Sequence, residues 1–100
     1  MARLVVTANA DADTTQILSY LERVAGKPVA QRYGRRFRET LERLVDLPET
    51  GAPRPKLGPN VRIAVVSPYV LIHEYTRGDD TLTLLRILHG RRNIKADLLR

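Results

Sequence analysis

The first half of the chain alternates polar and apolar residues with the period of a helix. Apolar residues recur every three or four positions over residues 8–25 and again over residues 28–46, which predicts two helices. Thr7 is a suitable N-cap for the first helix, and Gly26 followed by Pro28 ends it and begins the second. The short connection predicts that the two helices fold back on each other as an antiparallel hairpin.

The second half consists of β-rich stretches separated by turn residues. Stretches of Val, Ile, Leu and Tyr are interrupted at Ser67-Pro68 and at residues 77–80, whereas Pro and Gly crowd residues 48–60 and predict a loop there. We expect strands over residues 3–6, 61–66, 69–76 and 81–89 and a short helix over residues 91–100. The order β-α-α-β-β-β predicts a single α+β domain over residues 1–100, with the helical hairpin packed on one face of a small, mainly antiparallel sheet.

Turn lengths set the expected register of the last three strands. The turn at Ser67-Pro68 places Arg62 opposite His73. The turn at residues 77–80 places His73 opposite Leu84, and Leu71 opposite Arg86. One face of this sheet, predicted to pack against the helices, carries Val61, Ile63, Val65, Val70, Ile72, Leu85 and Ile87. The other face, predicted to be open, carries Arg62, Ala64, Val66, Tyr69, Leu71, His73, Tyr75, Leu82, Leu84, Arg86 and Leu88. Such an apolar face with Arg and His tips predicts a binding surface, although a one-residue slip in register would exchange the two faces.

Composition narrows the classes of protein and of site. The chain has no Cys and two His, so we expect no disulfide, no metal site and no cofactor. Its apolar runs reach four residues where a membrane span needs about 20, and its first residues turn polar before a secretory apolar region forms. We therefore expect a cytoplasmic protein with no membrane contact.

The net charge of +6 suggests an acidic partner. Counted by halves, residues 1–50 carry 8 basic and 7 acidic groups, and residues 51–100 carry 9 and 4. A solvated basic surface with no specific partner would explain the net charge equally well.

No catalytic constellation is visible. Ser19 and Ser67 have no nearby base, and no glycine-rich loop leads into a helix with Lys and Ser or Thr. His73 and His89 fit packed positions better than a general acid or base. Arg86, placed on a strand, has to reach a face or a carboxylate, because an unpaired buried guanidinium is costly.

The order of several motifs resembles the ParE toxins of the RelE/ParE superfamily. The matching segments are the helix opening Thr7 to Asp13, Pro48 to Gly51, the strand start Arg62, Tyr69 to Leu71, and the Arg-Ile-Leu-His-Gly-Arg-Arg run of residues 86–92. The resemblance implies the toxin of a type II toxin-antitoxin module, with plasmid stabilization as a role of such modules. It further implies silencing by a ParD-like antitoxin in a heterotetramer or larger complex, poisoning of DNA gyrase, and contact with operator DNA only through the antitoxin.

Two other functions stay open. One is a RelE-like ribosome-dependent mRNA endoribonuclease, for which Lys56 and Arg92 match basic positions of that family, whereas Val65 and Leu98 stand where an Arg and a Tyr are expected. The other is a basic nucleic-acid-binding module. The absence of the ribonuclease Arg and Tyr at positions 65 and 98 favours a protein-binding toxin over an enzyme, so we expect no catalytic residue. The candidate partner-binding residues are Arg62, Tyr69, Leu71, His73, Leu84, Arg86, Leu88, His89, Arg91 and Arg92.

Overall fold

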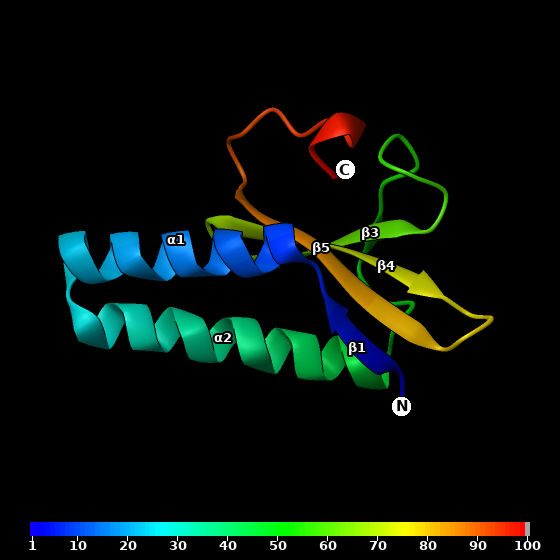
Figure 1. Ribbon diagram of the computed structural model, residues 1–100, viewed down its shortest axis with the longest axis horizontal. Helices are drawn as coiled ribbons and strands as arrows, with labels where there is room; N and C mark the ends of the chain where they lie inside the picture. The colour runs from blue at the N-terminus through cyan, green and yellow to red at the C-terminus, as the bar shows by residue number, and fades with distance from the viewer. Residues whose placement is uncertain (100) are drawn as a thin grey trace.

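A computed structural model describes residues 1–99 as a two-helix hairpin packed on a five-stranded sheet, which confirms the α+β class (Figure 1). The elements are β1 (Arg3–Val6), α1 (Ala8–Ala25), α2 (Lys27–Asp46), β2 (Ala52–Pro53), β3 (Val61–Val66), β4 (Tyr69–Thr76), β5 (Thr81–His89) and the 3-10 helix η1 (Ala96–Leu99). The expected order is present, with the two-residue strand β2 added inside the predicted loop. Among residues 1–99, neither helix is long and apolar enough to cross a membrane.

Local sequence signals set the helix ends as predicted. The Thr7 hydroxyl accepts a hydrogen bond from the Ala10 N–H at 3.0 Å and so caps α1. Gly26 joins the helices with φ of +96°, a left-handed conformation that glycine adopts without strain. Because one residue makes the connection, α1 and α2 lie antiparallel and side by side, and the end of the hairpin projects beyond the sheet (Figure 1).

The sheet has the strand order β1-β5-β4-β3-β2, in which β1 runs parallel to β5 and the other neighbours are antiparallel. The hairpin is therefore the crossover connection that returns the chain from β1 to the far edge of the sheet. This topology leaves β1 as an edge strand whose outer side pairs with no strand of residues 1–99.

A β-bulge changes the predicted register halfway along β5. Arg62 lies opposite His73, and His73 opposite Leu84, as expected. Beyond the irregularity at residues 72 and 73, however, Leu71 lies opposite Ile87 instead of Arg86. The residue between Leu84 and Arg86 has no partner on β4, and this extra residue turns all later side chains of β5 to the opposite face.

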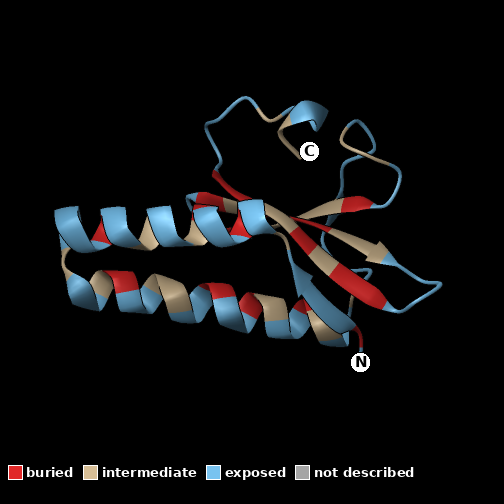
Figure 2. Cartoon of the chain, viewed as in Figure 1, coloured by how far each residue is buried: buried red, intermediate tan, exposed pale blue. Residues whose placement is uncertain are grey.

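Both faces of the sheet are covered. The helices pack on the face that carries Val66, Tyr69, Leu71, Leu84 and Ile87, and buried positions lie where the helices meet the sheet (Figure 2). The second face carries a smaller cluster, Val61, Ile72 and Leu88, against which Ile94, Leu98 and Leu99 pack from the C-terminal segment. The segment predicted as a short helix is thus a 3-10 turn that covers this face; Arg100 lies outside the described residues.

Candidate functional site

The face predicted to be open is the one that the helices cover, so the prediction of a bare binding surface is wrong. Tyr69, Leu71 and Leu84 belong to the core under the helices, and Leu71 and His73 have no exposed surface. Leu88 is buried as well, on the opposite face, beneath the C-terminal segment. In the folded chain these five side chains are core residues, and of the five only Leu84 also lines the groove described below.

Two physical causes explain the exchange of faces. The second face carries Val61, Ile72 and Leu88, so both faces are apolar and alternation does not say which one the helices take. The bulge then moves Ile87 onto the helix-covered face and Arg86 off it.

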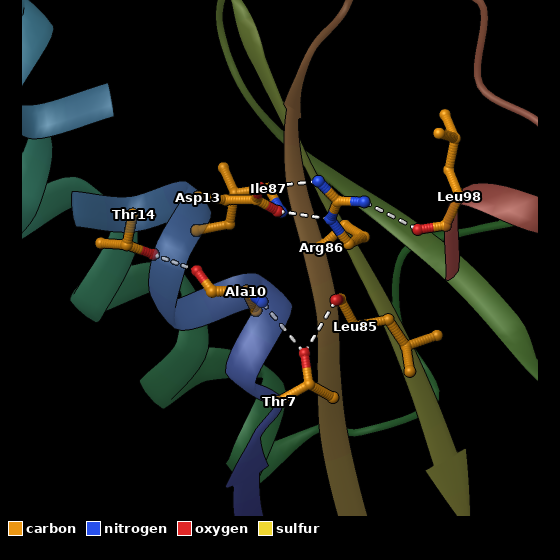
Figure 3. A network of polar contacts seen from close by, with 8 residues as sticks. All are labelled: Thr7, Ala10, Asp13, Thr14, Leu85, Arg86, Ile87 and Leu98. Carbon is orange, nitrogen blue, oxygen red and sulfur yellow. Dashed lines mark hydrogen bonds and ion pairs between the residues drawn. The ribbon is translucent and has the colours of Figure 1, made fainter. Parts of the chain in front are cut away.

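Arg86 forms a buried ion pair that ties three segments together (Figure 3). Its Nε and Nη2 donate to the two carboxylate oxygens of Asp13 in α1, at 2.7 and 2.8 Å. Its Nη1 donates to the Leu98 carbonyl in η1 at 2.8 Å. The hydrogen bond with Asp13 raises the pKa of Arg86. Asp13 is therefore the carboxylate partner that a buried guanidinium requires. Arg86 was predicted to contact a partner, and in the folded chain it joins α1 and η1 to β5.

Side chains of α1 and of its N-cap residue hydrogen-bond the main chain of β5 beyond the end of β1. The Ile87 N–H donates to Asp13 at 3.1 Å, and the Thr7 hydroxyl donates to the Leu85 carbonyl at 2.9 Å (Figure 3). These two side chains thus take the hydrogen bonds that a further strand would make, and the edge of β5 near Leu85 and Ile87 is closed to another chain.

His73 lies beneath the loop that follows α2. Within residues 1–99, neither ring nitrogen has a hydrogen-bond partner, and a Cβ added at Gly51 would lie 3.2 Å from the His73 Nε2. Burial first, and the nearby Arg62 charge second, lower the pKa of His73 to about 4. The imidazole is consequently neutral at pH 7 and closed to a substrate.

The remaining candidates reach the surface. Arg62 is half-buried and donates to the Gly51 carbonyl at 3.1 Å. His89 is exposed at the end of β5, and its Nδ1 accepts from the Arg91 N–H at 3.1 Å. Arg91 and Arg92 are exposed, so their contact with a partner stays a prediction.

An apolar groove of about 510 Å³ runs between β1 and α2. Leu4 and Val6 line it from β1, with exposed fractions of 41% and 44%, and Phe37, Leu41 and Val45 line it from α2. The groove is continuous with the unpaired edge of β1, so main-chain groups and apolar side chains face the same space.

Sequence reasoning missed this groove, although a signal was present. Side chains of a strand alternate between its two sides, so the run Leu4-Val5-Val6 makes both sides of β1 apolar. All four residues of β1 are nevertheless exposed. An edge strand that is apolar on both sides indicates that something else covers it.

Some titratable groups of residues 1–99 depart from their ordinary pKa values, but none form the cluster that a metal site requires. Within residues 1–99, no three His, Cys, Asp or Glu side chains lie close enough together to hold a metal ion. The Arg77 guanidinium lowers the pKa of the exposed Glu49 carboxyl, and a hydrogen bond to Asp80 raises the pKa of Tyr75. These shifts keep each group in its ordinary ionisation state at pH 7. The groove, a surface for binding, is the candidate site.

Comparisons with known proteins agree with this fold. The family model described as the ParE toxin of the type II toxin-antitoxin system parDE matches residues 4–94. Among solved structures, the chain is similar to one titled as a chromosomal ParDE toxin-antitoxin system from P. aeruginosa, with a TM-score of 0.74 and 24% identity over 89% of this chain and 96% of that chain. A search of curated proteins found no match. Because the family match covers nearly the whole chain, the protein belongs to the family of ParE toxins of type II toxin-antitoxin systems.

Proposed function

We propose that this toxin is silenced by a ParD-like antitoxin that fills the groove between β1 and α2, and that the free toxin inhibits DNA gyrase. Membership of the ParE family supports both parts. The single observation that carries the antitoxin part is the apolar groove beside an unpaired strand edge.

The geometry fits an extended segment of the antitoxin. A strand added along β1 would satisfy its free main-chain groups, and every second side chain of that strand would point into the groove. The groove is lined by Leu4, Val6 and Leu41, with Asp11 and Arg38 also lining it. Apolar side chains are therefore expected to supply most of the affinity, and the charges at the groove to fix the register.

A matched pair of substitutions tests this site. Leu4→Asp places a carboxylate in the groove and is expected to weaken antitoxin binding at least about a hundredfold, since it removes an apolar anchor and introduces an unpaired charge. Val65→Asp is the control, because Val65 is 63% exposed and lies on β3, outside the groove. Binding is measured by calorimetry and folding by a thermal melt. Equal binding by both variants, with equal melts, would exclude the groove as the antitoxin site.

The gyrase target is tested separately. Purified toxin is added to gyrase and relaxed plasmid, and loss of supercoiling that the antitoxin reverses is the expected result. Expression in bacteria should give filamentous cells with a DNA-damage response. Undiminished supercoiling at a large molar excess of toxin would contradict gyrase inhibition and leave the antitoxin site untouched.

The ribonuclease alternative rests on one cluster. His89, Arg91 and Arg92 lie close together in sequence at the end of β5 and are exposed, which is a composition that phosphate chemistry uses. Leu98, however, packs onto the sheet with Ile94 and offers no proton. Codon-positioned cleavage of mRNA on ribosomes, lost in His89→Ala, would favour this alternative over gyrase inhibition.

A further inference from the structure

A run of basic residues lies at the end of the hairpin where α1 passes into α2. Between Glu22 and Glu39 there are six basic residues and no acidic one: Arg23, Lys27, Arg32, Arg35, Arg36 and Arg38. Removing these six from the 17 basic residues leaves 11, which equals the number of acidic residues. Outside this run, residues 1–50 carry 2 basic and 7 acidic groups, so counting by halves conceals a strongly basic segment within a nearly neutral half.

Helix geometry gathers five of these cations on one side of α2. Successive helical residues are turned by about 100°, so Lys27, Arg32, Arg35, Arg36 and Arg38 spread over one half of the cylinder. The buried residues of α2, which are Ala30, Phe37, Thr40 and Leu44, occupy the other half. We call the five cations the basic face of α2.

The basic face is exposed and makes no ion pair within residues 1–99, although Glu22 of α1 lines the same shallow pocket as Lys27, Arg35 and Arg38. All five side chains are exposed, and the ion pairs found within residues 1–99 join Arg77 to Glu49 and Arg86 to Asp13, away from this face. Figure 2 shows pale blue, exposed positions along α2, and Arg35 and Arg38 lie on its side next to α1, where they line a pocket with Leu18. Five cations held this close repel one another, and a single nearby carboxylate does not balance them, so an anionic ligand would relieve that repulsion.

Two features aim the basic face at an outside partner. The hairpin end projects beyond the sheet, so the first turns of α2 pack on α1 alone and are clear of the sheet (Figure 1). The Arg36 guanidinium lies over the Tyr33 ring, 5.3 Å from its centroid, which limits the freedom of that side chain before binding. From Lys27 to Arg38 the face is about 18 Å long, which spans about five phosphates of one DNA strand.

We propose that the basic face of α2 binds the phosphate backbone of duplex DNA without sequence preference. A helix about 10–12 Å across fits the major groove of B-form DNA, whereas the major groove of A-form RNA is too narrow to admit one. The acidic residues Glu39, Glu42 and Asp46 follow on the later turns and confine the contact to the first half of α2. This site overlaps the antitoxin groove only at Arg38, and it places the toxin itself in contact with DNA.

Salt-dependent binding of a labelled 20-base-pair duplex to the full chain, followed by fluorescence anisotropy, tests the proposal. The triple variant Arg35→Gln, Arg36→Gln, Arg38→Gln removes three phosphate contacts, so affinity at 100 mM NaCl is expected to fall at least about tenfold. The slope of log affinity against log salt is expected to become about 2 to 3 less steep.

A matched control separates a site from net charge. Arg91→Gln, Arg92→Gln, Lys95→Gln removes three exposed charges from the C-terminal segment and is expected to leave DNA affinity within about twofold. Thermal melts confirm that both variants fold. Equal losses in the two variants, or no loss in the first, would overturn the proposal.

Two further ligands test the choice of DNA. An RNA duplex of the same length is expected to bind more weakly than DNA; equal or tighter binding would overturn the groove argument. Labelled polyglutamate is the probe for an acidic protein partner. If the first triple variant lost polyglutamate binding and kept DNA binding, the basic face would be a protein-docking surface and the proposal would be wrong.

Discussion

Replacing Asp13 by Ala should cost about 3 kcal/mol of folding stability. The Asp13 carboxylate accepts three hydrogen bonds, two from Arg86 and one from the Ile87 N–H. Its loss would leave the Arg86 guanidinium, whose side chain is 16% exposed, without its counter-ion. Breaking a buried ion pair costs about 3–5 kcal/mol, and the lower end applies because Arg86 keeps some water contact and its bond to Leu98.

The measurement is urea unfolding followed by circular dichroism. With a urea m-value of about 2 kcal/mol/M for a domain of this size, the midpoint should fall by about 1.5 M. Asp11→Ala is the matched control, since Asp11 is an exposed carboxylate in the first turn of α1, two residues before Asp13, and its loss should cost about 0.5 kcal/mol through the helix dipole.

A double-mutant cycle isolates the pair itself. Arg86→Met should also cost about 3 kcal/mol, because it leaves a carboxylate that is 9% exposed without its cation. The double variant should cost far less than the two singles together, with a coupling of about 2 kcal/mol or more. Additive effects, or a cost below about 1 kcal/mol for Asp13→Ala, would refute the view that this ion pair fastens α1 to β5.

Three further predictions address other parts of the chain. The pKa of His73 is lowered to about 4 in the folded chain from 6.5 in the unfolded chain, so between these pH values the unfolded chain binds the extra proton and folding stability is lost as the pH falls. Acidification from pH 7 to pH 4, followed by urea unfolding, should therefore cost the native chain up to about 3 kcal/mol more than the His73→Leu variant. Gly34→Ala should raise the folding stability by about 1 kcal/mol, since the added Cβ would lie 3.6 Å from Leu18, an ordinary contact. Gly51→Ala should lower the melting temperature, because Gly51 has a φ of +95° and the added Cβ would lie 2.7 Å from a carbonyl oxygen. Arg91→Glu with Arg92→Glu should slow antitoxin association at low salt in stopped-flow measurements without changing the melt; an unchanged rate would show that these residues do not face the antitoxin.

The elements were predictable because each has a local cause. Thr7 caps α1, Gly26 ends it, and the turns at Ser67-Pro68 and at residues 77–80 separate β3, β4 and β5 where expected. Strand β2 was not predictable, because its two residues, Ala52 and Pro53, join the sheet only through their pairing with β3. Short-range signals are strong here, and the missing element depends on a distant partner.

The assignment of the sheet faces failed for a different reason. It depended on a strict two-residue period through β5, and one extra residue at Leu85 breaks that period. Arg86 gave the only warning: a strand Arg on an apolar face needs a partner, and its partner, Asp13, lies 73 residues away on α1. The sequence contained both charges but nothing that joined them.

The placement of the two proposed sites on α2 carries a consequence for how the toxin is silenced. Phe37, Leu41 and Val45 line the groove, whereas the basic face lies on the first turns, and Arg38 is the one basic-face residue that also lines the groove. An antitoxin segment in the groove would then leave most of the basic face uncovered. The silenced complex is therefore expected to keep its affinity for DNA within about threefold of the free toxin, measured with an antitoxin fragment that lacks its own DNA-binding part. A complete loss of DNA binding on complex formation would mean that the antitoxin also covers α2, and that silencing works by masking the DNA contact.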